Sequence, residues 1–223
     1  MENIPRARNQ IDQWKSLMFL YNSALKAINV KIDILNNEFT QIYGYTPIEH
    51  VKSRLKTPES IVKKLKRNGV EVDVDGLETI NDIAGVRIIC SFSSDIYQIA
   101  DMIARQSDIT VLYVKDYTKK PKDNGYKSYH MVVTIPVYLA DGPVETKVEV
   151  QIRTIAMDFW ASLEHKIYYK SENTAPAYLQ QELKDCADVI DMLDEKMQSL
   201  NEAILEWNQR NQNEEPSEST EET

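Results

Sequence analysis

Near its C-terminal end the sequence contains a long, uninterrupted series of apolar residues that are spaced alternately by four and three positions. Its members are Leu179, Leu183, Cys186, Ile190, Leu193, Met197, Leu200, Ile204 and Trp207. This spacing places all of them on one stripe of an α-helix, and a length of about four heptads is typical of a helix that packs against another helix. A second series with the same spacing runs from Trp14 to Leu35. We therefore expect a long helix on each side of a central region.

Two interpretations of these helices stay open. In the first, they cover the central region or pair with each other within one chain; in the second, they join copies of the chain into a symmetric homo-oligomer. The pattern divides the chain into an N-terminal helical region at 1–44, a central domain at 45–170 and a C-terminal oligomerisation helix at 171–210. Residues 211–223 hold five glutamates and no basic residue, which is typical of a disordered acidic tail.

The overall composition is that of a globular protein with an acidic balance. Hydrophobic residues make up 42% of the 223 positions, no apolar run is long enough to span a bilayer, and the N-terminal residues MENIPRARNQ lack the apolar core of a signal peptide. We therefore expect a cytoplasmic protein with no membrane partner. Cys90 and Cys186 lack the spacing of a zinc site or a disulfide framework. The formal net charge of -9 disfavours a protein that coats nucleic acid through its overall field.

The residues between the two long helices alternate between short strand patterns and short helix patterns. Strands are predicted at 85–92, 109–117, 126–137 and 144–154, and helices at 58–68, 94–106 and 156–169. Ser93 or Ser94 is expected to cap the second of these helices. The third is expected to turn four apolar residues inward: Phe159, Trp160, Leu163 and Ile167. These elements predict an α+β fold around a mixed or mostly antiparallel sheet of four or five strands, flanked by helices.

One segment gathers basic residues although the chain as a whole is acidic. Residues 51–67 contain seven basic side chains and one acidic side chain. Thr57 is a suitable N-cap, Pro58 suits the first helical turn, and Gly69 suits the position just past the last turn. The segment is therefore predicted to contain a short helix whose surface is strongly cationic.

The cations of this segment are arranged in a way that suits a phosphate chain. Ser60, Lys64 and Arg67 share one helix face, and Arg54 and Lys56 precede it. Backbone N–H groups at a helix N-terminus also favour anions. A solvated charged helix is the alternative, although such helices usually mix both signs of charge.

Two acidic residues are candidates for binding a metal ion. The strand at 144–154 alternates strictly, with Val148, Val150 and Ile152 on one face and Lys147, Glu149, Gln151 and Arg153 on the other. A second acid, Asp82, precedes another strand close to Arg87. Two carboxylates beside a polyphosphate are a usual way to hold Mg²⁺. A solvent-exposed strand face and a turn cap would explain the same two acids without a metal.

Residues 122–130 combine aromatic rings with positive charges. In the predicted strand, Tyr126, Ser128 and His130 share one face, and Lys122 and Lys127 lie close by in the sequence. Aromatic rings stack on bases and lysines bind phosphates, so the segment is predicted to cradle a second nucleotide. Tyrosines packed at the edge of the core are the alternative interpretation of each ring.

These segments, in this order, resemble the synthetase domain of the RelA/SpoT family, which makes the alarmones ppGpp and pppGpp. The motifs that carry the resemblance are RLKTPES at 54–60, NDIAGVRI at 81–88, GYKSYH at 125–130, VEVQIRT at 148–154 and FWASLEHKIYYK at 159–170. With a helix before this domain and a long helix after it, the chain looks like the RelQ-type small alarmone synthetases. The resemblance implies a nucleotidyltransferase-like fold, a homotetramer, and transfer of the β,γ-diphosphate of ATP to the 3′-hydroxyl of GDP or GTP with release of AMP.

The resemblance also implies roles for individual residues. The ATP phosphates would be held by Arg54, Lys56, Ser60, Lys64 and Arg67, with Arg87 against the adenine. Asp82 and Glu149 would hold Mg²⁺, and Glu149 would also act as the base for the 3′-hydroxyl. Guanine would stack on Tyr126, and the acceptor nucleotide would be fixed by Lys122, His130 and Gln151.

Other functions are disfavoured by particular features of the sequence. None of the three histidines is followed by aspartate, so the metal site of the family's hydrolase domain is not expected, and the enzyme is expected to make the alarmone without degrading it. A nucleotide- or RNA-binding regulatory module without turnover is the alternative, although anion binding alone gains nothing from the two acids, and the net charge gives RNA binding little support. An oligomeric scaffold would leave the basic helix unexplained. Asp158 departs from the family pattern, which more often has asparagine there.

Overall fold

The centre of the fold is a five-stranded mixed sheet, and the computed structural model describes residues 4–170 and 176–214. The strands lie in the order β1-β2-β5-β4-β3, with β2 and β5 parallel and the other neighbours antiparallel. Their bounds are β1 Ile48–Leu55, β2 Ala84–Cys90, β3 Thr110–Asp116, β4 Tyr129–Leu139 and β5 Gly142–Thr154. The helices are α1 Ile4–Tyr43, α2 Pro58–Arg67, α3 Val74–Glu78, α4 Ser93–Ala104, α5 Ile155–Lys170 and α6 Ala177–Glu214. The predicted α+β class with a mixed sheet is confirmed.

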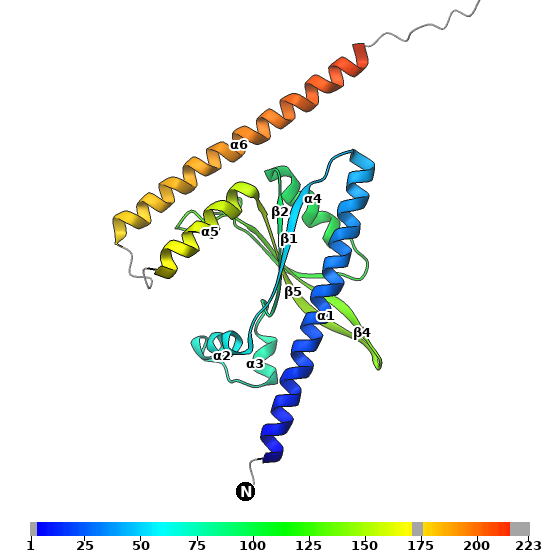
Figure 1. Cartoon of the computed structure of the whole chain (residues 1–223), viewed down its shortest axis with the longest axis vertical. Coiled ribbons are helices and arrows are strands. Elements are labelled where there is room, and N and C mark those ends of the chain that lie inside the picture. The colour runs from blue at the N-terminus through cyan, green and yellow to red at the C-terminus, as the bar shows by residue number, and fades with distance from the viewer. Residues whose placement is uncertain (1–3, 171–175, 215–223) are drawn as a thin grey trace, which may run out of the picture.

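The helix α1 covers one face of the sheet with the apolar stripe that the sequence predicted. Ala24, Ile28 and Ile32 are almost completely buried, and they share one core with Val148 and Val150 of β5. In Figure 1, α1 and α4 lie on one side of the sheet, while α2 and α5 lie on the other. The stripe of α1 is therefore used within the chain, and the polar face of β5 is left for the opposite side of the sheet.

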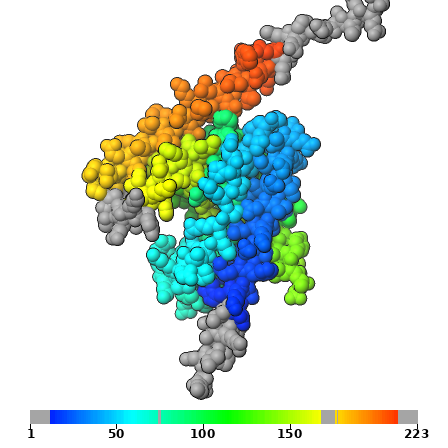
Figure 2. Space-filling model, viewed as in Figure 1, coloured from blue at the N-terminus to red at the C-terminus, as the bar shows by residue number. Residues whose placement is uncertain are grey.

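Most of the apolar stripe of α6 is not covered by the rest of the described chain. Leu193, Met197, Leu200, Ile204 and Trp207 are between 49% and 64% exposed. Figures 1 and 2 show this helix running past the sheet domain. It includes residues 211–214, which were predicted to belong to the acidic tail; the remainder of that tail, and residues 171–175, lie outside the described residues. Although α1 and α6 are long, no helix among the described residues combines the length and the apolar character needed to cross a membrane.

The basic segment contains a strand that the sequence analysis did not predict. The edge strand β1 exposes most of its side chains, so it lacks the apolar alternation that identifies a strand in a sequence. Its order comes from antiparallel pairing with β2, in which Lys52 lies opposite Arg87. The short helix that follows is as predicted: the side chain of Thr57 caps α2 by accepting from the N–H of Ser60, and Gly69 has a φ of +69° just past the end.

The strand predicted at 126–137 begins at Tyr129 instead. Residues before it form a loop in which Gly125 has a φ of +86°, a backbone conformation that glycine adopts more readily than other residues. Tyr126 and Ser128 therefore precede the strand and share no strand face, and Ser128 is fully buried and accepts a hydrogen bond from Arg153. The expected proximity of Tyr126 and His130 holds nevertheless, because the Tyr126 hydroxyl lies 2.9 Å from His130 Nε2.

The N-cap of α4 is Phe92, and neither serine has the predicted capping role. The side chain of Asp95 accepts a hydrogen bond from the Phe92 N–H at 3.0 Å. This bond is the half of a capping box in which an acid in the first turn accepts from the N–H of the N-cap residue.

The prediction for α5 was right for Trp160 and wrong for the three other apolar residues. Trp160 is buried and donates from its indole nitrogen to the Leu183 carbonyl of α6. Phe159, Leu163 and Ile167 are 58%, 41% and 45% exposed. The helix packs on β5 and α6 along one narrow stripe, so its other apolar stripe has no partner among the described residues and adds to the exposed apolar surface of α6.

Gly125 is the point at which α6 packs against the loop before β4. A Cβ at this position would lie 2.5 Å from the Cβ of Ala187, in addition to the strain of a positive φ. We expect Gly125→Ala to lower the free energy of unfolding by about 2–4 kcal/mol, measured by urea denaturation. Gly69→Ala is the matched control, because its φ of +69° is similar but nothing lies within 4 Å. Equal losses in the two variants would contradict close packing of α6 on this loop.

Candidate active site

The register of the sheet aligns polar residues from all five strands in one row. From β1 to β3, successive partners are Lys52, Arg87, Gln151, His130 and Lys115. Directly opposed residues project to the same face of a sheet, so these side chains face the side that α1 leaves open. The neighbouring row contains Arg54, Gly85 and Glu149. Two short rows thus bring together residues that are far apart in the sequence.

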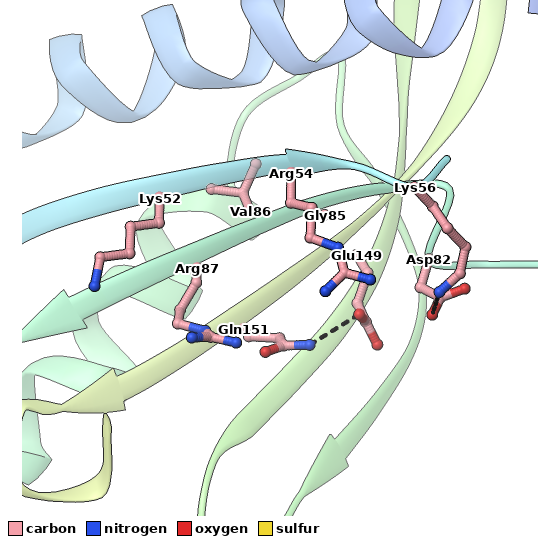
Figure 3. A pocket seen from close by; sticks show the side chains of 9 residues that line it. All are labelled: Lys52, Arg54, Lys56, Asp82, Gly85, Val86, Arg87, Glu149 and Gln151. Carbon is pink, nitrogen blue, oxygen red and sulfur yellow. Dashed lines mark hydrogen bonds and ion pairs between the residues drawn. The ribbon is translucent and has the colours of Figure 1, made fainter. Parts of the chain in front are cut away.

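A groove of about 340 Å³ opens over these rows. It is lined by Lys52, Arg54, Lys56, Asp82, Gly85, Val86, Arg87, Glu149 and Gln151 (Figure 3). Gly85 contributes no side chain between Arg54 and Glu149, and a Cβ there would find only one atom within 4 Å, at 3.7 Å. The groove therefore has room for a ligand at its centre, and its wall combines several cations with two carboxylates.

Asp82 holds two of the lysines by direct ion pairs. Its two carboxylate oxygens accept from Lys56 Nζ and Lys64 Nζ, each at 2.8 Å. Burial by itself raises the pKa of the Asp82 carboxyl, but the hydrogen bonds and charges of the two lysines lower that pKa below its ordinary value. Asp82 is therefore ionised, and it holds Lys56, which follows β1, close to Lys64 in the last turn of α2.

Glu149 lies in the middle of β5 with its carboxylate held from two sides. Oε2 accepts from Gln151 Nε2 at 2.9 Å, and Oε1 lies 3.6 Å from His130 Nδ1. Burial raises the pKa of the Glu149 carboxyl, and the contacts with His130 and Gln151 lower it by more, so the net shift is downward. A carboxylate fixed on a rigid strand and ionised at neutral pH is suited to bind a cation or to accept a proton.

An aromatic cluster continues the site beyond Glu149. The Tyr126 hydroxyl is hydrogen-bonded to His130, and the ring of Tyr117 packs edge-on against both rings. Lys122 Nζ lies 4.7 Å from the centre of the Tyr126 ring. The residues predicted to bind the acceptor nucleotide therefore form one contact group, joined to Glu149 through His130 and Gln151.

Six predicted site residues are not part of the groove lining: Ser60, Lys64 and Arg67 of α2, and Lys122, Tyr126 and His130 of the aromatic cluster. Ser60 and Arg67 are exposed on α2, and Ser60 is engaged with the capping residue Thr57. Of the three residues that were predicted to share one helix face, only Lys64 contacts Asp82. Residues that share one face of α2 therefore do not all reach the same part of the site.

Three residues that the sequence analysis did not assign to the site belong to its charge cluster. Lys52 lines the groove, while Arg153 and Asp158 are buried beside Tyr126 and Arg87. The alternation of β5 was a usable signal for Arg153, because it lies on the same face as Glu149. No such signal existed for Lys52, since β1 was not recognised as a strand, or for Asp158, because its contact with Arg87 joins residues 71 positions apart.

The two acids of the groove fit a metal that arrives with a polyphosphate. Asp82 and Glu149 are both ionised and line the same groove. Within residues 4–170 and 176–214, no group of three or more His, Cys, Asp or Glu side chains could hold a metal ion. Mg²⁺ is commonly bound by one or two carboxylates together with substrate phosphates and water, so a third protein ligand is not required.

Comparisons with known proteins match this part of the chain. A family model described as "Region found in RelA / SpoT proteins" matches residues 53–174. The GTP pyrophosphokinase YwaC of Bacillus subtilis is 48% identical over 195 residues, which cover 87% of this chain and 93% of that protein.

Solved structures with the same fold include two proteins from Bacillus subtilis. Small alarmone synthetase 2 has a TM-score of 0.79 and 48% identity, and the match covers 85% of this chain and 98% of that chain. Small alarmone synthetase 1 bound to its product pppGpp has a TM-score of 0.80 and 34% identity, and the match covers 87% of this chain and 99% of that chain.

The Asp82 ion pairs predict how stability changes in acid. Because the pKa of Asp82 is lowered on folding, its contribution is complete above about pH 3.8 and is lost as the pH falls below that value toward the folded-state pKa. We expect Asp82→Asn to lower the free energy of unfolding at pH 7 by about 1–3 kcal/mol and to flatten the loss of stability below pH 4. The measurement is urea denaturation at a series of pH values.

Asp101→Asn is the matched control for this variant. Asp101 pairs with Arg105 at 2.8 Å on the exposed surface of α4, so we expect a change of about 0–1 kcal/mol. An Asp82→Asn protein with the acid profile of the wild type would show that the two lysines do not stabilise the Asp82 carboxylate.

Proposed function

This chain belongs to the RelA/SpoT family, and on that premise we propose that it is a GTP pyrophosphokinase. ATP donates its β,γ-diphosphate to the 3′-hydroxyl of GDP or GTP, which gives ppGpp or pppGpp and AMP. One observation carries the proposal: the carboxylate of Glu149 lies in a groove with a cationic wall, and it contacts His130, which is hydrogen-bonded to Tyr126. The site thus offers one region for a phosphate chain, one for a base, and a carboxylate that joins them.

The cationic wall is the proposed site of the ATP phosphates. Lys56 and Lys64 share the single negative charge of Asp82 in the free protein, so a bound phosphate chain offers them further anionic partners. Arg54 lines the same wall. The guanidinium of Arg87 is proposed to stack on the adenine, as its planar group favours. Ser60 and Arg67 are exposed on α2. We assign them the remaining phosphate contacts, which would form when their side chains or the ligand move.

Mg²⁺ is the metal that we propose for this site. Asp82 and Glu149 would hold it, and the phosphate oxygens of the substrate would supply further ligands. When bound, the ion neutralises the phosphate charge that otherwise opposes the approach of two anionic substrates. The metal and the two lysines would compete for the oxygens of Asp82, because each oxygen already accepts from one lysine in the free protein.

Glu149 is the proposed base. Its ionised carboxylate accepts the proton of the 3′-hydroxyl while the hydroxyl oxygen forms a bond to the β-phosphorus of ATP. The bond between that phosphorus and the oxygen that bridges to the α-phosphate breaks, and AMP leaves with the bonding electron pair. Gln151 keeps the carboxylate oriented through its 2.9 Å hydrogen bond. The protein contributes position and charge, which are the main requirements of phosphoryl-type transfer.

The aromatic cluster is the proposed site of the guanine nucleotide. Tyr126 would stack on the guanine, and the exposed side chain of Lys122 would leave the ring and bind a phosphate of the acceptor. His130 and Gln151 lie between this ring and Glu149, so they are proposed to fix the ribose end of the acceptor. Both substrates are nucleotides of the cytoplasm, where we place the enzyme.

A nucleotide- or RNA-binding module without turnover is the competing function. The ion pairs of Asp82 and the hydrogen-bonded Glu149 disfavour it, because two carboxylates in the groove weaken simple anion binding. The two functions differ in product formation, which is directly measurable.

The first test is turnover. With ATP, GDP and Mg²⁺ we expect ppGpp and AMP in equal amounts by nucleotide chromatography, and Glu149→Gln is expected to lower the rate about 100-fold to 10,000-fold while the protein stays folded at the assay temperature. Glu145→Gln is the matched control, because this exposed residue of β5 does not line the groove. A wild type that binds both nucleotides without forming either product would support the binding module. A Glu149→Gln enzyme with normal turnover would remove the proposed base.

The second test concerns assembly. We propose a homotetramer in which the exposed apolar residues of α5 and α6 are covered by other copies. Light scattering is expected to give about four times the mass of one chain, and Leu200→Asp is expected to lower it. Ser199→Asp is the control, since it adds the same charge next to the stripe. A monomeric wild type would end the tetramer proposal.

A further inference from the structure

Asp158 is a buried acid at the meeting point of three cations. Its carboxylate is 3.1 Å from Arg153 Nη1, 3.3 Å from Arg87 Nη1 and 3.9 Å from Lys52 Nζ. The residue is 8% exposed and belongs to the first turn of α5, directly after β5. Within the described chain it is the acid that Arg87 and Arg153 share.

On one side of Asp158, Arg153 determines how the acceptor region is arranged. This arginine is 4% exposed, and its guanidinium lies 5.0 Å from the centre of the Tyr126 ring. It donates to the Tyr126 hydroxyl at 2.5 Å and to Ser128 Oγ at 3.3 Å. The position of the Tyr126 ring therefore depends on where Arg153 is held.

The influence of Arg153 extends to the catalytic carboxylate through Gln151. Arg153 donates to Gln151 Oε1 at 3.2 Å, and Gln151 Nε2 donates to Glu149 at 2.9 Å. An arginine can only donate and an ionised glutamate can only accept, so the amide between them has a single favourable orientation. If Arg153 were displaced, the side-chain amide of Gln151 would no longer have a single favourable orientation.

On the other side of Asp158, Arg87 lines the groove at the proposed adenine position. Burial and the nearby charge of Arg153 lower the pKa of Arg87, and Asp158 opposes this effect. Its Nε is a buried nitrogen that has no hydrogen-bond partner in the described part of the chain. Arg87 is thus held mainly by Asp158, and two arginines that repel each other are kept close by one acid.

We propose that Asp158 is a positioning residue that serves both nucleotide sites, holding Arg87 for the donor and Arg153, with Tyr126, for the acceptor. The proposal rests on the function proposed above, because it uses the assignment of the two sites. It deepens that function by identifying the group that links them. A role in stability alone would leave the affinities for both nucleotides unchanged in any variant that folds.

The expected effect follows from removing one charge without changing the shape of the side chain. In Asp158→Asn the carboxylate is lost, so Arg87 and Arg153 repel each other without a shared acid and move apart. Each move displaces a different nucleotide contact. The KM for ATP and the KM for GDP are therefore both expected to rise, by about tenfold or more, since hydrogen bonds to charged groups have this strength.

The experiment measures each KM at a saturating level of the other substrate, together with the affinity of each nucleotide alone by titration calorimetry. Wild type, Asp158→Asn and the surface control Asp101→Asn are compared. A rise in both KM values and both dissociation constants for Asp158→Asn, with Asp101→Asn unchanged, is the expected result. A change for one nucleotide only, or for neither, in a folded Asp158→Asn protein would overturn the proposal.

A second variant covers the case in which Asp158→Asn does not fold. Arg153→Met combined with Asp158→Asn removes both buried charges, which is often tolerated where removal of one is not. Arg87 still lacks its acid in this protein, so ATP binding is expected to be about tenfold weaker; wild-type ATP binding would overturn the proposal. Absence of nucleotide binding by the wild type would instead refute the proposed function, and calorimetry distinguishes the two failures.

Discussion

The parallel pairing of β2 with β5 is the constraint on which the rest of the site depends. It sets Gly85 beside Glu149 and Arg87 beside Gln151, and the antiparallel neighbours β1 and β4 extend the same rows. A shift of one residue in this register would turn Glu149 toward the core and Val150 toward the groove, since side chains alternate between faces. The burial of Val148, Val150 and Ile152 under α1 excludes that shift. Hydrophobic packing on one face therefore fixes the chemistry of the other.

The acids of the site offset part of its positive charge before any ligand is present. Asp82 pairs with Lys56 just after β1 and with Lys64 in the last turn of α2, and Asp158 pairs with the two arginines beside the aromatic cluster. Each acid keeps like charges close together at a position where phosphates or bases can replace it or lie beside it. This arrangement explains why an acidic chain carries one dense cationic region: the positive charge is confined to the groove, and the surplus of negative charge lies elsewhere.

The sequence predicted the types of most elements because the signals for them are local. Thr57 caps α2, and the alternation along β5 predicted which of its faces is buried. The strand β1 was missed because an exposed edge strand has no apolar alternation. Phe159, Leu163 and Ile167 were misplaced because an apolar helix stripe does not say whether its partner lies in the same chain. For α1 the partner is the sheet, whereas for α5 and α6 most of the stripe is left exposed.

For the site, the sequence by itself determined which residue types are present and on which face of β5 Glu149, Gln151 and Arg153 lie. The family resemblance added expected roles. Only the tertiary structure decided that Lys56 and Lys64 share Asp82, that Ser60 and Arg67 lie outside the groove, and that Asp158 joins Arg87 to Arg153. The physical reason is that alternation and helical spacing act over a few residues, while these contacts join segments up to 71 positions apart. Strand register and helix docking bring such segments together, and neither is encoded in any one segment alone.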